Sequence, residues 1–268
     1  MVSSLRRLAQ SVRHAPGLSS LGFLWDLLRK PYLSVLTSLG SQNGFSVTIG
    51  GNLMALHPVF GTLNWEIIET DSYQAFADTI KSGDIVYDIG AHIGTYTLIA
   101  LRKSEPQGQV VAYEPHNITR NYLIQHLEWN AGRERTIVRE VCCGAAIGIT
   151  DFYYLQDEPE GMNSLVPVEG FEKKQVQVTT VDAEVTNLGL IPSIIKIDVE
   201  GAEWDVLKGA ELTLRQYHPI IFLSLHPLAL AKLDTTPEII LEWLTQLDYK
   251  YQVIAQDHEI HILAYALD

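Results

Sequence analysis

Cysteine is scarce in this 268-residue sequence, which contains only the adjacent pair Cys142 and Cys143. Neighbouring cysteines have poor geometry for an ordinary disulfide, and two thiols are too few for a structural metal site. This scarcity argues against a small secreted fold held together by disulfides. It is typical of proteins in a reducing compartment, so a cytoplasmic location is expected.

Long apolar runs are also missing. The segment from Leu18 to Leu28 could imitate the core of a signal peptide, but Asp26 interrupts it, and no other run is long enough to cross a bilayer. We find neither low-complexity tracts nor internal repeats. With 47% hydrophobic and 19% charged residues, the composition is that of a globular protein whose length suits one large α/β domain.

Basic residues are few, with 19 Lys and Arg against 32 Asp and Glu, a net charge of −13. Such a charge repels a phosphate backbone, so a nucleic-acid partner is not expected. Residues 1–40 are the exception, because they hold five basic residues and the single acid Asp26. The N-terminus therefore has its own electrostatic character.

The N-terminal segment from Ser3 to about Leu39 has apolar residues at helical spacing, interrupted at Pro16 and Pro31. Two short helices are expected there. They either pack on the core as a cap or lie as a basic amphipathic element on anionic lipid. In the second case, residues 1–35 would make a peripheral membrane contact. In residues 45–70, apolar and polar residues alternate around glycines, which predicts a small hairpin. We therefore expect an N-terminal extension, 1–70, followed by the main domain, 71–268.

The pattern from residue 71 onward predicts a doubly wound α/β fold. After a helix at 71–81, strands at 85–89, 110–113 and 137–143 alternate with helices at 95–103 and 119–130, and almost wholly apolar strands follow at 194–199 and 220–225. Strand-like stretches at 152–155 and 175–181 interrupt this rhythm. The segments 249–255 and 259–266 read as a hairpin, which adds an antiparallel strand to a mostly parallel sheet.

Glycines at the end of the first of these strands predict a ligand-binding turn. Gly90 and Gly94 give the spacing G-x-x-x-G, which differs from the G-x-G-x-x-G of a pyrophosphate-binding turn and suits an amino-acid and ribose portion instead. Glu114 ends the next strand, 24 residues after Gly90, near the offset at which an acid binds ribose hydroxyls. The alternative is that the glycines only close the strand and that Glu114 is a solvated acid at a strand end.

Acids also gather at the end of the apolar strand near residue 197. Lys196, Asp198 and Glu200 share one face of a strand otherwise made of Ile and Val, and buried charges there need partners or a place at the carboxyl end. Because ligands of open α/β sheets bind at the carboxyl ends, these acids should border the crevice with Gly90. His226 ends the next strand and is a candidate general base, metal ligand or bystander.

Four motifs resemble the FkbM family of methyltransferases. They are the segment 88–94, Tyr113-Glu114-Pro115, Thr180-Val181-Asp182, and above all the segment 195–210, and the resemblance covers roughly residues 83–227. It implies a class I, Rossmann-like fold with a seven-stranded sheet. It also implies methyl transfer from S-adenosylmethionine, typically to a hydroxyl of a sugar, glycolipid or polyketide acceptor.

The resemblance also assigns roles to residues. Carried over residue by residue, it places Asp88, Gly90, Gly94, Glu114 and Asp198 around the cofactor. The turn residues beside them complete the predicted cofactor-binding set: Ala91, His92 and Thr95. Two positions depart from the family pattern: His92 stands where the family usually has Asn, and Ser224 stands where it often has Glu.

In-line attack of a hydroxyl on the sulfonium methyl requires removal of one proton, and Asp198, Glu200 and His226 are the catalytic candidates. In a metal-assisted version, Mg²⁺ on Asp198 and Glu200 would lower the hydroxyl pKa. Two other functions compete: a nucleotide-dependent oxidoreductase, disfavoured by the glycine spacing and the terminal hairpin, and a non-catalytic membrane-associated module.

Overall fold

The computed structural model describes residues 43–65, 68–155, 169–256 and 258–266. The two helices expected within residues 3–39 and the membrane contact of residues 1–35 lie outside these ranges. The boundary at residue 70 stays a prediction. No helix in the described ranges is long and apolar enough to cross a membrane.

Seven strands form the main sheet, in the order β11-β12-β10-β9-β3-β4-β5. Their bounds are Tyr249–Gln256 (β11), Ile260–Ala266 (β12), Ile220–Leu225 (β10), Ile194–Ile197 (β9), Ile85–Ile89 (β3), Gln109–Tyr113 (β4) and Thr136–Arg139 (β5). Strands β5, β4, β3, β9 and β10 run parallel, and β12 is antiparallel to both β10 and β11. The expected class I methyltransferase sheet, with its C-terminal hairpin, is confirmed.

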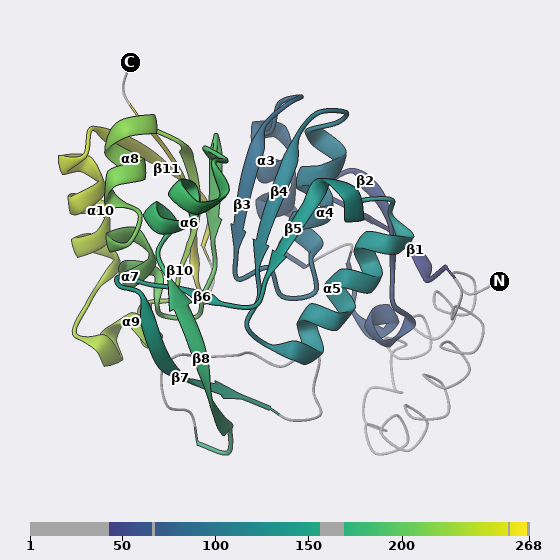
Figure 1. Ribbon diagram of the computed structural model, residues 1–268, viewed down its shortest axis with the longest axis horizontal. Coiled ribbons are helices and arrows are strands. Elements are labelled where there is room, and N and C mark those ends of the chain that lie inside the picture. Colours follow the sequence, from purple (N-terminus) through teal and green to yellow (C-terminus); the bar gives the residue numbers. More distant parts are fainter. Residues whose placement is uncertain (1–42, 66–67, 156–168, 257, 267–268) are drawn as a thin grey trace, which may run out of the picture.

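Neighbouring residues of a strand point to opposite faces of the sheet. Both faces of this sheet are apolar, and helices cover both of them. Val86 packs with helices α3 (Thr70–Thr79), α4 (Thr95–Lys103) and α5 (Asn117–Trp129). Tyr87 and Ile89 pack with α6 (Val181–Leu188), α7 (Glu203–Lys208), α8 (Glu211–Tyr217) and α10 (Pro237–Gln246). Short helices α9 (Pro227–Leu230), η1 (Pro58–Thr62), η2 (Arg133–Arg135) and η3 (Ala231–Leu233) complete the connections (Figure 1).

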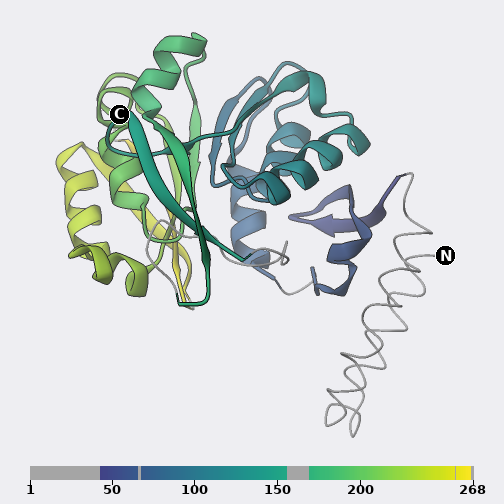
Figure 2. The ribbon, with the colours of Figure 1, turned by 60° about the horizontal axis from the view of Figure 1, so that its bottom comes forward.

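The predicted hairpin at 45–70 is present as β1 (Phe45–Ile49) and β2 (Asn52–Leu56), which turn at Gly50 and Gly51. Strand β1 contacts α3, and β2 contacts α4 and α5, so the hairpin lies against the first helical layer (Figure 2). Its buried residues Val47, Met54 and Leu56 belong to the same hydrophobic cluster as α3 and α4.

The interruption after residue 140 is a separate three-stranded sheet rather than an edge of the main one. It joins β6 (Cys142–Cys143), β8 (Glu172–Thr179) and β7 (Gly148–Tyr154), and the β7–β8 hairpin extends below the main sheet in Figure 1. The strand expected over 137–143 is therefore two strands in two sheets. Helix α6, which the sequence analysis did not predict, is capped by the Thr180 side chain.

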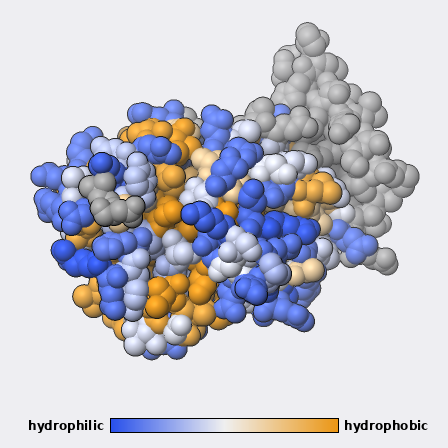
Figure 3. All heavy atoms as spheres, turned by 90° about the horizontal axis from the view of Figure 1, so that it is seen from above, coloured by the Kyte–Doolittle hydropathy of each residue, from blue (hydrophilic) through white to orange (hydrophobic). Residues whose placement is uncertain are grey.

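The face seen from above in Figure 3 carries several separate groups of apolar side chains among hydrophilic ones. The parallel strands β3, β4 and β9 all end at the same edge of the main sheet, where the glycine turn and the acids follow them. That edge holds the candidate site.

Candidate active site

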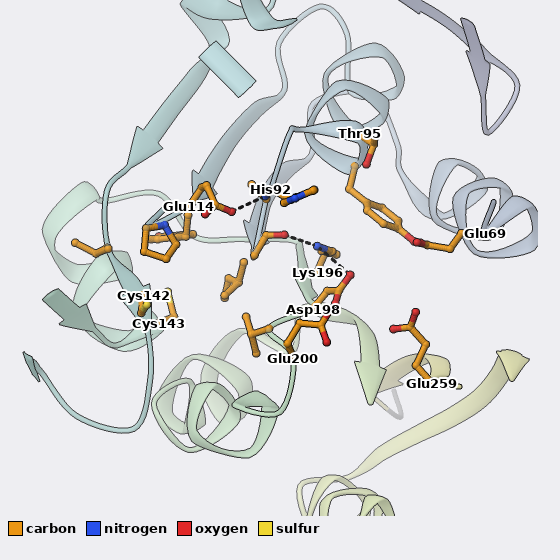
Figure 4. Close-up of a pocket in the computed structure, with 18 of the residues that line it drawn as sticks. Glu69, His92, Thr95, Glu114, Cys142, Cys143, Lys196, Asp198, Glu200 and Glu259 are labelled. Atoms are coloured by element: carbon orange, nitrogen blue, oxygen red, sulfur yellow. Dashed lines mark hydrogen bonds and ion pairs between the residues drawn. The ribbon is translucent and has the colours of Figure 1, made fainter. Parts of the chain in front are cut away.

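A cavity of about 300 Å³ lies at the carboxyl ends of β3, β4 and β9. Glu114, Cys142 and Cys143 lie at one end, Lys196 and Asp198 at the middle, and Glu69 and Glu259 at the other (Figure 4). The volume is within the range of small-ligand sites. The crevice predicted from the parallel strands is therefore present, and Gly90, Glu114 and Asp198 all line it.

The glycine turn is closely packed against the β9 loop. Gly90 has a φ of +80°, and a Cβ atom there would lie 1.8 Å from the carbonyl oxygen of Asp198. Only glycine satisfies both conditions. The turn can therefore bring its backbone against a ligand while remaining in contact with the loop that carries the acids.

Glu114 holds the same turn from the β4 side. Its two carboxylate oxygens accept hydrogen bonds from the amides of His92 (2.7 Å) and His116 (2.8 Å), and the side chain is buried. Burial raises the pKa of Glu114, although both amides favour the ionised form. Two oxygens have about four acceptor positions, and the Thr119 side chain also hydrogen-bonds the carboxylate, so capacity for a ligand hydroxyl remains.

Asp88 and Gly94 lie behind the turn and do not line the cavity, whereas Ala91, His92 and Thr95 do. Asp88 is completely buried, accepts a hydrogen bond from Thr97 (2.5 Å) and lies 3.3 Å from the ammonium of Lys196. It acts on the cavity only through these neighbours.

Lys196 is the central buried cation of the site. Its ammonium donates to the Gly90 carbonyl (2.9 Å) and lies 3.6 Å from Asp198 and 4.9 Å from the centre of the Tyr96 ring. Burial alone would lower the Lys196 pKa, but the charges of Asp88 and Asp198 raise it overall. In return, although burial opposes it, Lys196 lowers the pKa of Asp198.

The predicted catalytic residues come together. His226 Nε2 lies 3.5 Å from Glu200 and 3.8 Å from Asp198, and its Nδ1 lies 2.7 Å from Glu203. Burial alone would lower the His226 pKa, but hydrogen bonds with Glu203 and Glu259 raise it to about 11. Without a cation at Nε2, these hydrogen bonds favour the protonated imidazole, which fits poorly with the role of general base considered for it.

Two further acids have perturbed pKa values. Burial raises the pKa of Glu200 to about 7, and it raises that of Glu69 to about 7 with help from the charge of Asp198. Glu69 accepts a hydrogen bond from the Tyr96 hydroxyl (2.9 Å). Both acids therefore change charge near neutral pH.

Backbone strain marks the same cavity. Seven non-glycine residues in the described ranges have positive φ angles, and four of them, Ala131, His218, Asp234 and Asp248, follow or cap a helix end, where this conformation is common. The other three, Glu69, His92 and Glu200, line the cavity. Strained residues of this kind cluster at functional sites.

Several residues of the site were not predicted from the sequence. Cys142 and Phe152, from the smaller sheet, form an apolar wall near Glu114, and burial raises the pKa of the Cys142 thiol to about 12. Glu69 precedes α3, and Glu259 precedes β12. Only Glu259 left a signal in the sequence, as a strand-end acid beside His258.

A family model of the methyltransferase FkbM domain matches residues 88–251, more than half of the chain. Hexuronic acid methyltransferase AglP of Haloferax volcanii is 26% identical over 155 residues, which cover 57% of this chain and 61% of the relative. Methyltransferase 1 of Beauveria bassiana is 29% identical over 149 residues, 47% of this chain and 58% of the relative.

A crystal structure of methyltransferase FkbM from Methylobacillus flagellatus KT shares the fold, with a TM-score of 0.52 at 18% identity over 90% of this chain and 60% of that one. The chain thus spans about three fifths of the length of these proteins. The matched residues include the glycine turn, Glu114 and the acids after β9. The chain belongs to the FkbM methyltransferases.

Proposed function

We propose that this chain transfers the methyl group of S-adenosylmethionine to a hydroxyl of a sugar, glycolipid or polyketide-like acceptor. The observation that carries the proposal is the continuous cavity along the ends of β4, β3 and β9, bounded by an acid at each end. Ligands of open α/β sheets bind at this edge.

The residues of the cavity fit S-adenosylmethionine. Glu114 has acceptor capacity left for a ribose hydroxyl, the apolar Cys142 and Phe152 suit the base, and the Gly90 turn suits the amino-acid portion. This orientation directs the sulfonium toward Asp198. Because Glu200 lies near Asp198, and Glu69 and Glu259 line the end of the cavity beyond it, the surrounding charge favours a sulfonium cation.

The acceptor hydroxyl must then meet the methyl group at the Asp198 end and lose a proton. Both ring nitrogens of His226 already face carboxylates, at 2.7 and 3.0 Å, which leaves Asp198 or Glu200 as the proton acceptor. The Mg²⁺-assisted version, with the ion on Asp198 and Glu200, stays a prediction from the sequence.

A sugar hydroxyl is the acceptor we favour. AglP, a relative named as a hexuronic acid methyltransferase, is 26% identical to this chain over 155 residues. Membrane contact through residues 1–35 would suit a lipid-linked sugar and is part of the same proposal.

Incubation of the protein with S-adenosylmethionine labelled in its methyl group and with sugar and glycolipid acceptors tests this function. We expect label in the acceptor and S-adenosylhomocysteine as the second product, with Asp198→Asn slower by a factor of about 10² and cofactor binding retained. Thermal stabilisation by NAD and not by S-adenosylhomocysteine would instead support an oxidoreductase. Binding to liposomes without any cofactor affinity would support a membrane module.

A further inference from the structure

Three donor atoms, from Asp198, His226 and Glu259, converge beside the cavity, and an oxygen of Glu200 lies near the histidine. His226 Nε2 lies 3.0 Å from a Glu259 oxygen, 3.5 Å from a Glu200 oxygen and 3.8 Å from an Asp198 oxygen. The donors come from three places in the fold: the end of β10, the start of β12 and the loop after β9. The atoms of Asp198, His226 and Glu259 all lie within 4.8 Å of one another.

These separations are those of ligands that share one metal ion. Nitrogen and oxygen donors bind divalent transition metals at about 2.1 Å, which places two donors about 3.0 Å apart at a right angle and about 3.4 Å apart at a tetrahedral angle. The closest two distances from His226 Nε2 are of this size. Three protein side chains can therefore coordinate an ion here without moving far.

A second layer of buried side chains orients these donors. Glu203 is fully buried, accepts from the Gly201 amide (2.8 Å) and holds His226 Nδ1 at 2.7 Å, which points Nε2 toward the three acids. This is the carboxylate–histidine arrangement common behind metal-bound imidazoles.

Glu259 has a similar support. One of its oxygens lies 3.6 Å from His261 Nε2, and the other ring nitrogen of His261 lies 2.9 Å from the Ser224 hydroxyl. Ser224 and His261 are direct partners across β10 and β12. The small Ser224 thus leaves room for the histidine that supports Glu259.

Charge also favours a cation at this point. Four carboxylates surround His226, and the nearby Lys196 lies between Asp88 and Asp198 rather than among the other acids. A proton on Nε2 accounts for one hydrogen bond, to Glu259 at 3.0 Å, whereas oxygens of Glu200 and Asp198 lie 3.5 and 3.8 Å from the same nitrogen. A sulfonium would balance part of the charge, but it accepts no lone pair, whereas a divalent ion in place of the Nε2 proton can be shared by the nitrogen and the acid oxygens. A divalent ion accounts for both the charge and the convergence.

We propose that Asp198, His226 and Glu259 bind one divalent transition-metal ion, with Glu200 beside it as a fourth oxygen donor. An imidazole among carboxylates suits Mn²⁺, Fe²⁺ or Zn²⁺ better than Mg²⁺, which prefers oxygen ligands and keeps its waters. This set differs from the Mg²⁺ pair expected from the sequence, because it includes His226 and Glu259. Both Asp198 and Glu259 line the cavity, so the ion would face the acceptor.

Metal binding can be measured without any acceptor, so its failure is distinguishable from failure of the methyltransferase function. Chelator-treated full-length protein is titrated with Mn²⁺, followed by electron paramagnetic resonance and calorimetry. We expect one Mn²⁺ per chain, weaker binding of Mg²⁺, and at least a tenfold loss of Mn²⁺ affinity in Glu259→Gln and in His226→Gln. Such losses are typical for removal of a ligand or of its support.

Glu211→Gln is the matched control, because Glu211 is an exposed acid that pairs with Arg215 on α8. It should bind Mn²⁺ like the wild type. If His226→Gln does not fold, Glu259→Gln decides the test, since it preserves the shape of the side chain. The proposal is overturned if folded wild type binds no stoichiometric Mn²⁺, if Mg²⁺ binds as tightly as Mn²⁺, or if Glu259→Gln binds Mn²⁺ like the control.

Discussion

Lys196→Met is the substitution whose effect the structure defines best. The ammonium is 2% exposed and compensates the completely buried Asp88 at 3.3 Å, whereas Asp198, at 3.6 Å, is partly exposed and can turn to water. Removing one partner of a buried ion pair costs about 3–5 kcal/mol. We therefore expect a loss of this size in the free energy of unfolding, most of it due to uncompensated Asp88.

Urea denaturation and thermal melting measure this effect. For a chain of this size, about 2–4 °C is lost per kcal/mol, so the melting temperature of Lys196→Met should fall by roughly 6–20 °C. Lys208→Met is the matched control, because Lys208 pairs with Asp205 on the surface and such pairs contribute at most about 1 kcal/mol.

The double variant Asp88→Asn with Lys196→Met separates charge from packing. A neutral side chain at position 88 can still accept the hydrogen bond from Thr97, so the double variant should recover at least about 2 kcal/mol of the loss in the single variant. If Lys196→Met costs no more than Lys208→Met, or if the double variant is no more stable than the single one, the buried ion pair does not have the role assigned to it.

Three further predictions concern the cavity. Glu114→Gln should keep the shape of the turn but weaken S-adenosylmethionine binding by about 1.5–3 kcal/mol in calorimetry, since charged hydrogen bonds are lost; an unchanged Kd would remove Glu114 from the site. Gly90→Ala should abolish cofactor binding and lower the melting temperature, because the new methyl group meets the Asp198 carbonyl; normal binding would place the cofactor elsewhere. Glu69→Gln should stabilise the fold above pH 7. The folded pKa of Glu69, about 7, lies above its ordinary value, so its ionisation costs stability as pH rises from about 4.5 to 7. The gain should be about 2 kcal/mol at pH 8, after solvent screening, and absent at pH 4; equal gains at both pH values would contradict it.

Most of the main sheet was predictable, because its signals are local. Strand β3 and helix α4 have the predicted bounds, since an apolar strand, a glycine turn and an amphipathic helix follow one another without interruption. The division of residues 137–143 between two sheets was not predictable. Apart from Arg139 and Glu140 the segment is apolar throughout, and Cys142 and Cys143 belong to the other sheet because they pair with the distant β8.

The site was predictable where the carboxyl ends of parallel strands place residues together, as for Gly90, Glu114 and Asp198. Glu69 and Glu259 enter it from outside that pattern, through the start of a helix and an antiparallel strand. The chemical state of His226 also depends on contacts. Its place at the end of a strand left a general base, a metal ligand and a bystander open, and the hydrogen bonds with Glu203 and Glu259, from separate parts of the chain, raise its pKa and disfavour the base.

The position of β12 has a consequence for biosynthesis. This strand follows all the others in the sequence, yet it lies between β10 and β11, and β11 has no other neighbour in the sheet. A ribosome-bound chain that has emerged only as far as β11 can already assemble the Gly90 turn and Glu114, but it lacks Glu259 and leaves the edge of β10 exposed. Cofactor affinity should therefore arise earlier during synthesis than the complete acidic centre, and chaperones that bind unpaired strand edges would find their target on β10 in that interval.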